Sequence, residues 1–340
     1  MSENVPSMSL PPTSEMEVSA QHMRDGLYHF SESNPELALE NFDAAIRIRE
    51  AHPWWQDVQS SWLLAAAWIN RSDVLRVLDA VRNRDEIIRS LDRAIDAMNF
   101  VPLDTNSAFA DRMILAWINR GEAVGDAGDV GAALADFSMA EKFLLQYGED
   151  GSVRRKFLGA MLKSNRARFL NEAHQSSEAW KDSLDAIRIF DGIEQQEEAL
   201  VAGIKARATA CRALALILDE PGGHEKVGDW IAVATDLIED ALDRARLSDL
   251  REPWVDDLVR FGAKIYRVCQ PQFLGQFLTE WLAVGNDSGL IEEMQDELRL
   301  ARLDLGKRVL ISSEDTEFVE SQTKILVTLQ NAEIRLKELR

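Results

Sequence analysis

The chain has 340 residues, of which 28% are charged and 46% are hydrophobic, a composition typical of soluble globular proteins. Its 58 acidic residues outnumber its 38 basic residues, so the formal net charge is −20. This excess of negative charge argues against binding to nucleic acid, which needs a surplus of Lys and Arg to contact phosphates, and against docking on anionic lipid.

The sequence predicts helices throughout. Residues 1–16 contain three prolines and several serines without an apolar period, which predicts a disordered tail and no signal peptide. Beyond this tail, apolar residues recur every 3.6 residues and no segment alternates as a strand does, so we expect an all-α fold. Asp129 is an expected N-cap, a loop is expected at 219–223, and helix starts are predicted at Asn34-Pro35, Pro253 and Pro271.

Internal repeats are visible along most of the chain. The segment Ala67–Arg71 (AWINR) recurs as Ala116–Arg120, and Ser164–Ala167 is a fainter copy. Each copy precedes a second helix with a triplet at steps of four and three residues, which places the three side chains on one helical face. Five such triplets occur: Ala38-Phe42-Ala45, Ile87-Leu91-Ala94, Ala133-Phe137-Ala140, Ala179-Ser183-Ala186 and Ala234-Ile238-Ala241.

These repeats resemble the tetratricopeptide repeat family. The best copy matches that family's signature through Trp117, Gly121, Gly128, Asp129, Ala133, Phe137 and Ala140. The triplets are separated by 49, 46, 46 and 55 residues, whereas the standard period is about 34, so the chain resembles a long-helix variant. The resemblance implies an α-solenoid that winds as a right-handed superhelix.

The repeats suggest a division of the chain. We expect a disordered tail at 1–16, a repeat array at 17–245, divergent helical repeats at 246–312 and a C-terminal helix at 313–340. An a/d seam spans about three heptads of this last segment, which is too short to be stable alone; its residues are Gln322, Ile325, Leu329, Ala332, Leu336 and Leu339. The helix is therefore expected either to cap the solenoid or to pair with a second copy. We favour capping, although a homodimer stays open.

Two rows of polar residues follow the repeats. Arg120 and Arg166 each precede an aspartate by sixteen residues, so we expect the pairs Arg120–Asp136 and Arg166–Asp182 to join the two helices of a repeat. The asparagines Asn70, Asn119 and Asn165 either have a similar structural role or form a ladder that contacts a peptide backbone, because an amide both donates and accepts hydrogen bonds. The residues three positions further, Asp73, Glu122 and Arg168, are candidate site residues beside them.

Signatures of catalysis or of cofactor binding are missing. The sequence lacks GxxxxGK[ST], GxGxxG, HExxH and GxSxG patterns. The face with His22, Asp25 and His29 has no third strong metal ligand, and Cys211 is expected to be a small core residue. Of the adjacent Trp54 and Trp55, either one is an exposed anchor or, as we prefer, both pack on flanking helices. We therefore predict neither an enzyme nor a bound metal or cofactor.

The family resemblance implies a binding protein. Members are mostly scaffolds whose first helices line a groove for a partner peptide or helix. A subclass that clamps chaperone tails is disfavoured, because Ile69 and Ile118 are among the residues that fill its basic positions. We expect a cytoplasmic scaffold or adaptor that binds a protein or peptide partner, a basic one given the net charge. The alternative is a peptide-sensing regulator whose C-terminal segment transmits the binding event.

Overall fold

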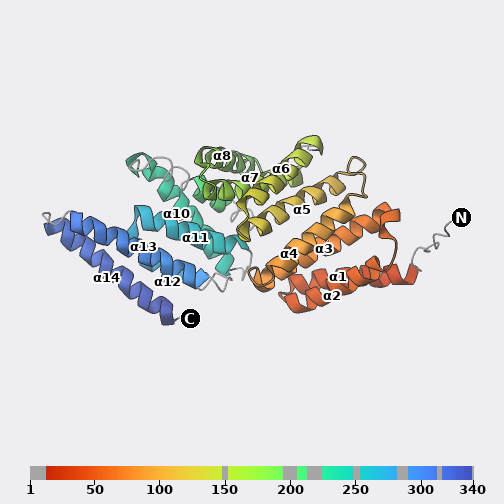
Figure 1. Ribbon diagram of the computed structural model, residues 1–340, viewed down its shortest axis with the longest axis horizontal. Helices are drawn as coiled ribbons and strands as arrows, with labels where there is room; N and C mark the ends of the chain where they lie inside the picture. Colours follow the sequence, from red (N-terminus) through yellow and green to blue (C-terminus); the bar gives the residue numbers. More distant parts are fainter. Residues whose placement is uncertain are drawn as a thin grey trace. The chain divides into compact units, whose positions relative to one another are not determined.

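The computed structural model describes residues 13–147, 152–193, 205–212, 224–247, 253–281, 290–311 and 316–338. These residues form helices joined by turns, in pairs that follow each other along the chain (Figure 1). The chain divides within α7 into two compact units, Met1–Leu162 and Lys163–Arg340. The predicted tail lies largely outside the described residues, and α1 already begins at Thr13. The predicted boundary at 245/246 stays a prediction.

The first unit contains three complete helix pairs and the start of a fourth. Its elements are α1 (Thr13–Ser31), α2 (Pro35–Glu50), the 3-10 helix η1 (Trp54–Gln56), α3 (Val58–Asp79), α4 (Arg84–Met98), α5 (Ser107–Asp126), α6 (Val130–Tyr147) and the first half of α7 (Val153–Glu172).

The second unit continues with α7 and six further labelled helices. They are α8 (Ser176–Asp191), α10 (His224–Leu247), α11 (Pro253–Cys269), α12 (Pro271–Trp281), α13 (Leu290–Ile311) and α14 (Thr316–Glu338). Residues 205–212 are also helical, and we refer to them as the 205–212 helix. The predicted loop at 219–223 lies outside the described residues.

Local sequence signals explain most of the helix ends. Pro253 and Pro271 begin α11 and α12 as predicted, and the carboxylate of Asp129 accepts a hydrogen bond from the Ala132 N–H at 2.9 Å. Asn34 precedes Pro35 at the start of α2, but its side chain does not cap the helix and donates instead to the Glu32 carbonyl. The turn inside three pairs uses a left-handed residue at equivalent positions: Ser33, Gly128 and His174.

The predicted triplets lie on the buried faces of the second helices. All fifteen of their residues are buried. The Phe137 side chain is fully buried, and a Cβ added to Gly121 of α5 would lie 2.9 Å from its ring, so the ring rests directly on the partner helix. Phe42 lies on Gly26 in the same way. The small residue on one helix thus makes room for the large residue on the other.

The predicted arginine row is confirmed. In the first unit Arg120 of α5 donates to Asp136 of α6 at 2.6 and 2.7 Å, and also to Asp92 of α4 at 2.6 Å. One repeat earlier, Arg71 binds Asp43 of α2 and Ser90 of α4 in the same manner. In the second unit Arg166 of α7 binds Asp182 of α8 at 2.5 and 3.0 Å. In the first unit each arginine therefore joins its own second helix to that of the preceding repeat.

A double-mutant cycle measures this link. We expect Arg120→Ala and Asp136→Ala to show a coupling energy of about 0.5–3 kcal/mol in urea unfolding, because the two groups share a charged, mostly buried hydrogen bond. The equivalent cycle on Arg244 and Asp240, an exposed pair on α10, is the control and should give about 0.5 kcal/mol or less. Zero coupling between Arg120 and Asp136 would contradict the structural role of the row.

The C-terminal helix packs within its own chain. In α14 the predicted seam residues Leu329 and Ala332 are buried in a core shared with α12 and α13. A Cβ on Gly275 of α12 would lie 2.9 Å from the Ala332 Cβ, so the two helices approach closely. The described part of α14 therefore packs on helices of its own chain, and its role as the cap of the solenoid stays a prediction. Leu336 and Leu339 have side chains outside the described set.

Arg49 departs from the repeat pattern. It lies four residues after Ala45 in α2, and the equivalent residues of α4, α6 and α8 are apolar: Met98, Leu144 and Phe190. Arg49 is only 2% exposed, and its Nε and Nη1 atoms have no hydrogen-bond partner among the described residues. Burial lowers its pKa to about 10, so the guanidinium keeps its charge at neutral pH.

Replacing Arg49 with methionine should therefore stabilise the protein. We expect the free energy of unfolding to rise by about 1–4 kcal/mol, because an apolar side chain of similar volume removes a buried charge that no carboxylate of the described residues balances. Urea unfolding of Arg49→Met against the wild type measures this change. Arg47→Met, on the exposed side of the same helix, is the control and should change stability by about 0.5 kcal/mol or less. A loss of stability in Arg49→Met would contradict the expectation.

The tryptophan pair at 54–55 lies in the 3-10 helix rather than in an α-helix. The Trp54 ring packs edge-on against Phe100, with ring centroids 5.4 Å apart. Trp55 is 45% exposed, so our preferred interpretation that both rings pack on flanking helices was wrong for Trp55. The extended backbone at Asp57, which caps α3 through a bond from the Ser60 N–H, separates the pair from the following helix.

Candidate functional site

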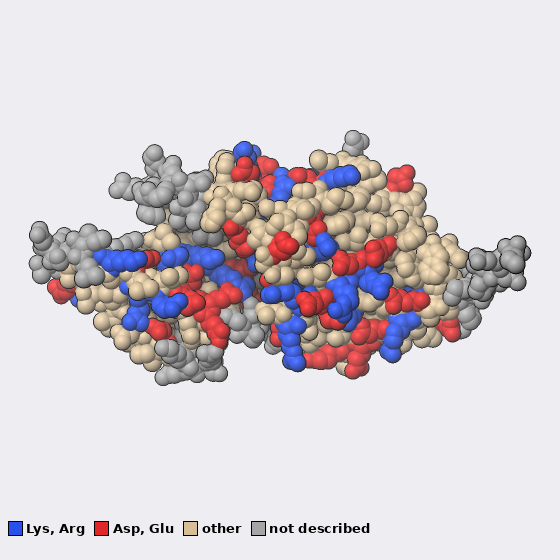
Figure 2. Space-filling view, viewed as in Figure 1, with Lys and Arg blue, Asp and Glu red and all other residues tan. Residues whose placement is uncertain are grey.

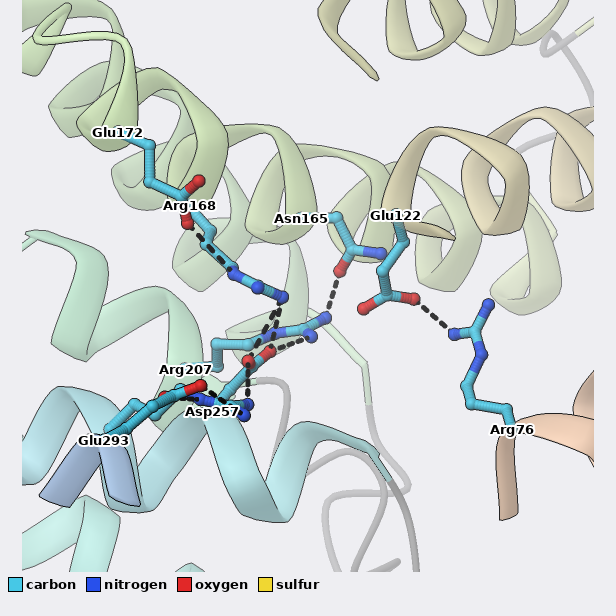
Figure 3. Close-up of polar contacts among 9 residues, drawn as sticks. Arg76, Glu122, Asn165, Arg168, Glu172, Arg207, Asp257 and Glu293 are labelled. Carbon is cyan, nitrogen blue, oxygen red and sulfur yellow. Dashed lines mark hydrogen bonds and ion pairs between the residues drawn. The ribbon is translucent and has the colours of Figure 1, made fainter. Parts of the chain in front are cut away.

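In the first unit, the predicted site residues lie together on the first helices α3 and α5. Asn70 and Asp73 share one face of α3, with Arg76 one turn further. The Asn119 side chain of α5 donates to the Asp73 carboxylate at 3.2 Å, and Arg76 donates to Glu122 at 2.6 Å (Figure 3 shows the second contact). The two first helices are thus joined by polar contacts on this face, which we call the α3–α5 polar face.

Asn70 differs from the other asparagines. Its side chain is half-buried, and among the described residues its amide has no hydrogen-bond partner. Asn119 and Asn165 are both buried and both take part in intrachain hydrogen bonds. Asn70 is therefore the member of the predicted ladder whose amide is free to bind a ligand in this structure.

The charges on the α3–α5 polar face are predominantly negative. Burial alone would lower the pKa of Arg76, but the nearby carboxylates of Glu122, Asp73 and Asp126 raise it. Three carboxylates thus surround a single guanidinium. This surplus of negative charge favours a cationic or hydrogen-bond-donating ligand on the face.

In the second unit, the predicted residues Asn165 and Arg168 belong to a larger polar cluster (Figure 3). Its centre is Asp257 of α11, which is buried and accepts from Arg168 of α7 at 3.2 Å and from Arg207 of the 205–212 helix at 3.0 Å. Arg207 also donates to the Asn165 side-chain oxygen. Arg168 and Arg260 extend the cluster to Glu172 and Glu293 respectively. We call this arrangement the Asp257 cluster.

The Asp257 cluster joins first helices of successive pairs. Arg168 and Asp257 are separated by 89 residues in the sequence, and Arg207 and Asp257 by 50. The negative carboxylates hold the pKa of Arg260 above its usual range despite burial. The buried Asp257 carboxylate balances the charge of several guanidinium groups. The stability of the cluster therefore depends on Asp257 more than on its other members.

Several site residues were not predicted from the sequence. Arg76, Arg207 and Asp257 contact predicted site residues, but no repeat motif marks them. The spacing of three residues from Asp73 to Arg76 was a usable signal, because it continues the polar face of α3. Nothing in the sequence indicated that Asp257 faces Arg168. The ladder that we predicted from Asn70 through Asn119 to Asn165 stays a prediction.

The other residues that we considered, at His22, Asp25, His29 and Cys211, do not form a metal or catalytic site among the described residues. His22 Nδ1 lies 2.9 Å from the Asn41 side-chain oxygen, while Asp25 accepts from Gln21. In the described part of the chain, no three His, Cys, Asp or Glu side chains are grouped as a metal ion would require. Burial raises the pKa of Cys211 to about 12, which agrees with the predicted role of a core residue. None of the helices described here combines the length and the apolar character of a membrane span.

A surface pocket of about 760 Å³ lies elsewhere in the first unit. Side chains of α1, α2 and α3 line it, among them His22, Arg47 and Trp68. None of the six predicted site residues lines this pocket. On the face shown in Figure 2, Lys and Arg side chains lie among Asp and Glu rather than in a separate basic patch.

The paired helices, the buried triplets and the glycine contacts together define an α-solenoid of tetratricopeptide-like repeats. A Rap protein in complex with competence and sporulation factor has the same fold, with a TM-score of 0.50 at 14% identity over 98% of this chain and 78% of that one. RapI in its apo form gives a TM-score of 0.48 at 12% identity, covering 94% and 97%. The Rap conjugation gene regulator of plasmid pLS20, in complex with the Phr* peptide, gives 0.44 at 13% identity, covering 99% and 81%.

No family model matches the sequence, and the comparison with curated proteins finds no relative.

Proposed function

We propose that this protein is a peptide-sensing regulator that binds a peptide on the first helices of its repeats. The observation that carries the proposal is the α3–α5 polar face. On this face the Asn70 amide has no partner among the described residues, beside the Asn119–Asp73 and Arg76–Glu122 contacts. The fold is shared with a Rap protein whose structure contains competence and sporulation factor, which supports a ligand-binding role over a catalytic one.

The contacts on this face explain how binding would be sensed. A peptide backbone offers both N–H donors and C=O acceptors, so it can bind the Asn70 amide and replace the Asn119–Asp73 hydrogen bond. That bond joins α3 to α5, which belong to successive repeats. Because each repeat contacts only its neighbours, a change in one such link alters the relative position of the repeats that follow. A passive adaptor, by contrast, needs no such coupling.

The charge of the face suggests which peptides bind. Asp73, Glu122 and Asp126 surround Arg76, so the segment that contacts α3 and α5 is expected to be basic. We propose a cytoplasmic location for the protein, in keeping with its unpaired thiols.

Peptide capture, followed by a comparison of the free and the loaded protein, tests the proposal. The full chain is incubated with the low-molecular-weight peptide fraction of a host extract, and bound peptides are identified by mass spectrometry. Hydrogen–deuterium exchange and sedimentation then compare the free and the loaded protein. We expect the bound peptides to be basic and the exchange of α3 and α5 to be slower in the loaded protein. We also expect the loaded protein to change its sedimentation coefficient or the set of host proteins that it captures from the extract.

The matched variants are Asn70→Ala and, as control, Asn331→Ala on the exposed side of α14. Asn70→Ala should reduce peptide capture at least several-fold, because the amide contacts are lost, whereas the control should capture peptides like the wild type. Equal capture by the two variants would remove the binding face from the proposal. Peptide binding that leaves both the exchange of other helices and the captured proteins unchanged would identify a passive adaptor.

A further inference from the structure

The first two helices pack in a regular antiparallel register. His22 of α1 contacts Asn41 of α2, and the Ser19 hydroxyl donates to the Ala45 carbonyl at 3.4 Å. The Ser19–Ala45 contact sets the register for the next helical turn. Four residues before Ser19 is Glu15 and four residues after Ala45 is Arg49, so these two residues lie opposite each other. Arg49 is the buried arginine that has no hydrogen-bond partner among the described residues.

Glu15 nevertheless does not pair with Arg49. Its carboxylate accepts a hydrogen bond from His52 Nε2 at 2.8 Å. His52 follows the end of α2, and its backbone N–H donates to the Arg49 carbonyl, so the two side chains leave neighbouring points of one turn. The Glu15 side chain is 53% exposed. The end of α2 therefore presents two cationic or donor side chains, and the Glu15 carboxylate binds the outer one, His52.

We propose that Arg49 and His52 form a carboxylate-binding site, which the first turn of α1 covers and Glu15 partly occupies, and that a carboxylate from a ligand or partner displaces Glu15. This inference concerns the first repeat alone and does not depend on the α3–α5 polar face.

The guanidinium determines the class of ligand. Arginine stays charged at neutral pH and donates in a planar arrangement that matches a carboxylate. Arg49 occupies a position that is apolar in α4, α6 and α8, and its buried charge has no counter-ion among the described residues, which points to a ligand rather than to packing.

Access to the site requires only a local opening. Glu15 lies in the first turn of α1, and the first turns of helices open more readily than helix interiors. The contact between Glu15 and His52 closes this turn against the end of α2. A carboxylate that binds Arg49 and His52 would therefore replace an intrachain contact by an equivalent one and would supply the missing counter-ion.

Acetate is the probe for the test, with the full chain at pH 7 and constant ionic strength maintained with chloride. Arginine Nε–H resonances and the thermal unfolding temperature are followed during the titration. We expect acetate to shift the Arg49 resonance and to raise the unfolding temperature. Glu15→Gln should bind acetate several-fold more tightly than the wild type, because the competing carboxylate is gone. Glu17→Gln, an exposed residue of the same helix, should behave like the wild type.

Arg49→Met should lose the response to acetate. An equal response in Arg49→Met and the wild type, or no response in Glu15→Gln, would overturn the proposal. The resonance shift in Glu15→Gln keeps the test independent of how Arg49→Met folds. Inorganic phosphate at the same ionic strength is the last comparison: a response as strong as that to acetate would overturn the assignment to carboxylates.

Discussion

Replacing Phe137 with alanine is expected to lower the free energy of unfolding by about 3–5 kcal/mol. The ring is fully buried and rests directly on Gly121 of α5, and a glycine has no side chain that could fill the space left by the ring. The loss therefore combines the transfer free energy of a phenyl ring with the free energy of the cavity that remains.

Urea unfolding followed by circular dichroism measures this effect. Leu145→Ala on the same helix is the control, because Leu145 is highly exposed, and it should change stability by about 0.5 kcal/mol or less. A loss in Phe137→Ala too small to detect would show that α5 and α6 do not pack as described.

Removing the Asp257 carboxylate should have a comparable effect in the second unit. We expect Asp257→Ala to lower the free energy of unfolding by about 3–5 kcal/mol, because the buried Arg207 and the partly buried Arg168 would lose the carboxylate that both contact. Glu293→Ala is the control. Its carboxylate binds Arg260 at the surface, where an ion pair contributes about 1 kcal/mol or less.

The two variants separate the effect of burying a carboxylate from the effect of pairing it with arginine. Both Asp257 and Glu293 are bonded to arginine, but only Asp257 is buried. Equal losses of stability in the two variants would mean that desolvation does not determine the stability of the cluster. A small loss of stability in Asp257→Ala would exclude Asp257 as the centre of the polar contacts in the second unit.

Much of the fold was predictable because it follows from local spacing. The steps of four and three residues in each triplet place three side chains on one helical face wherever the helix lies. For the same reason the sixteen-residue spacing from Arg120 to Asp136, repeated from Arg166 to Asp182, predicted contacts that the structure confirms. In both cases the residues lie within one helix pair, so a short segment contains all the information.

The left-handed turn residue inside three of the pairs does not follow from local spacing alone. Gly128 indicates a left-handed residue, and the structure has one there. Ser33 and His174 adopt the same conformation at equivalent positions, although neither residue type signals it. The packing of the two helices imposes the turn, because it outweighs the cost of about 1–2 kcal/mol for a left-handed residue.

The sequence by itself determined the helix pairs, their buried faces and the arginine row, because these depend on neighbours within about forty residues. Only the tertiary structure decided which polar residues pair across repeats: Asn119 with Asp73, Arg168 with Asp257, and Arg49 with none of the described residues. The physical reason is that stacking of successive first helices sets these contacts. Stacking depends on helix lengths and crossing angles summed over whole repeats, which no local spacing encodes.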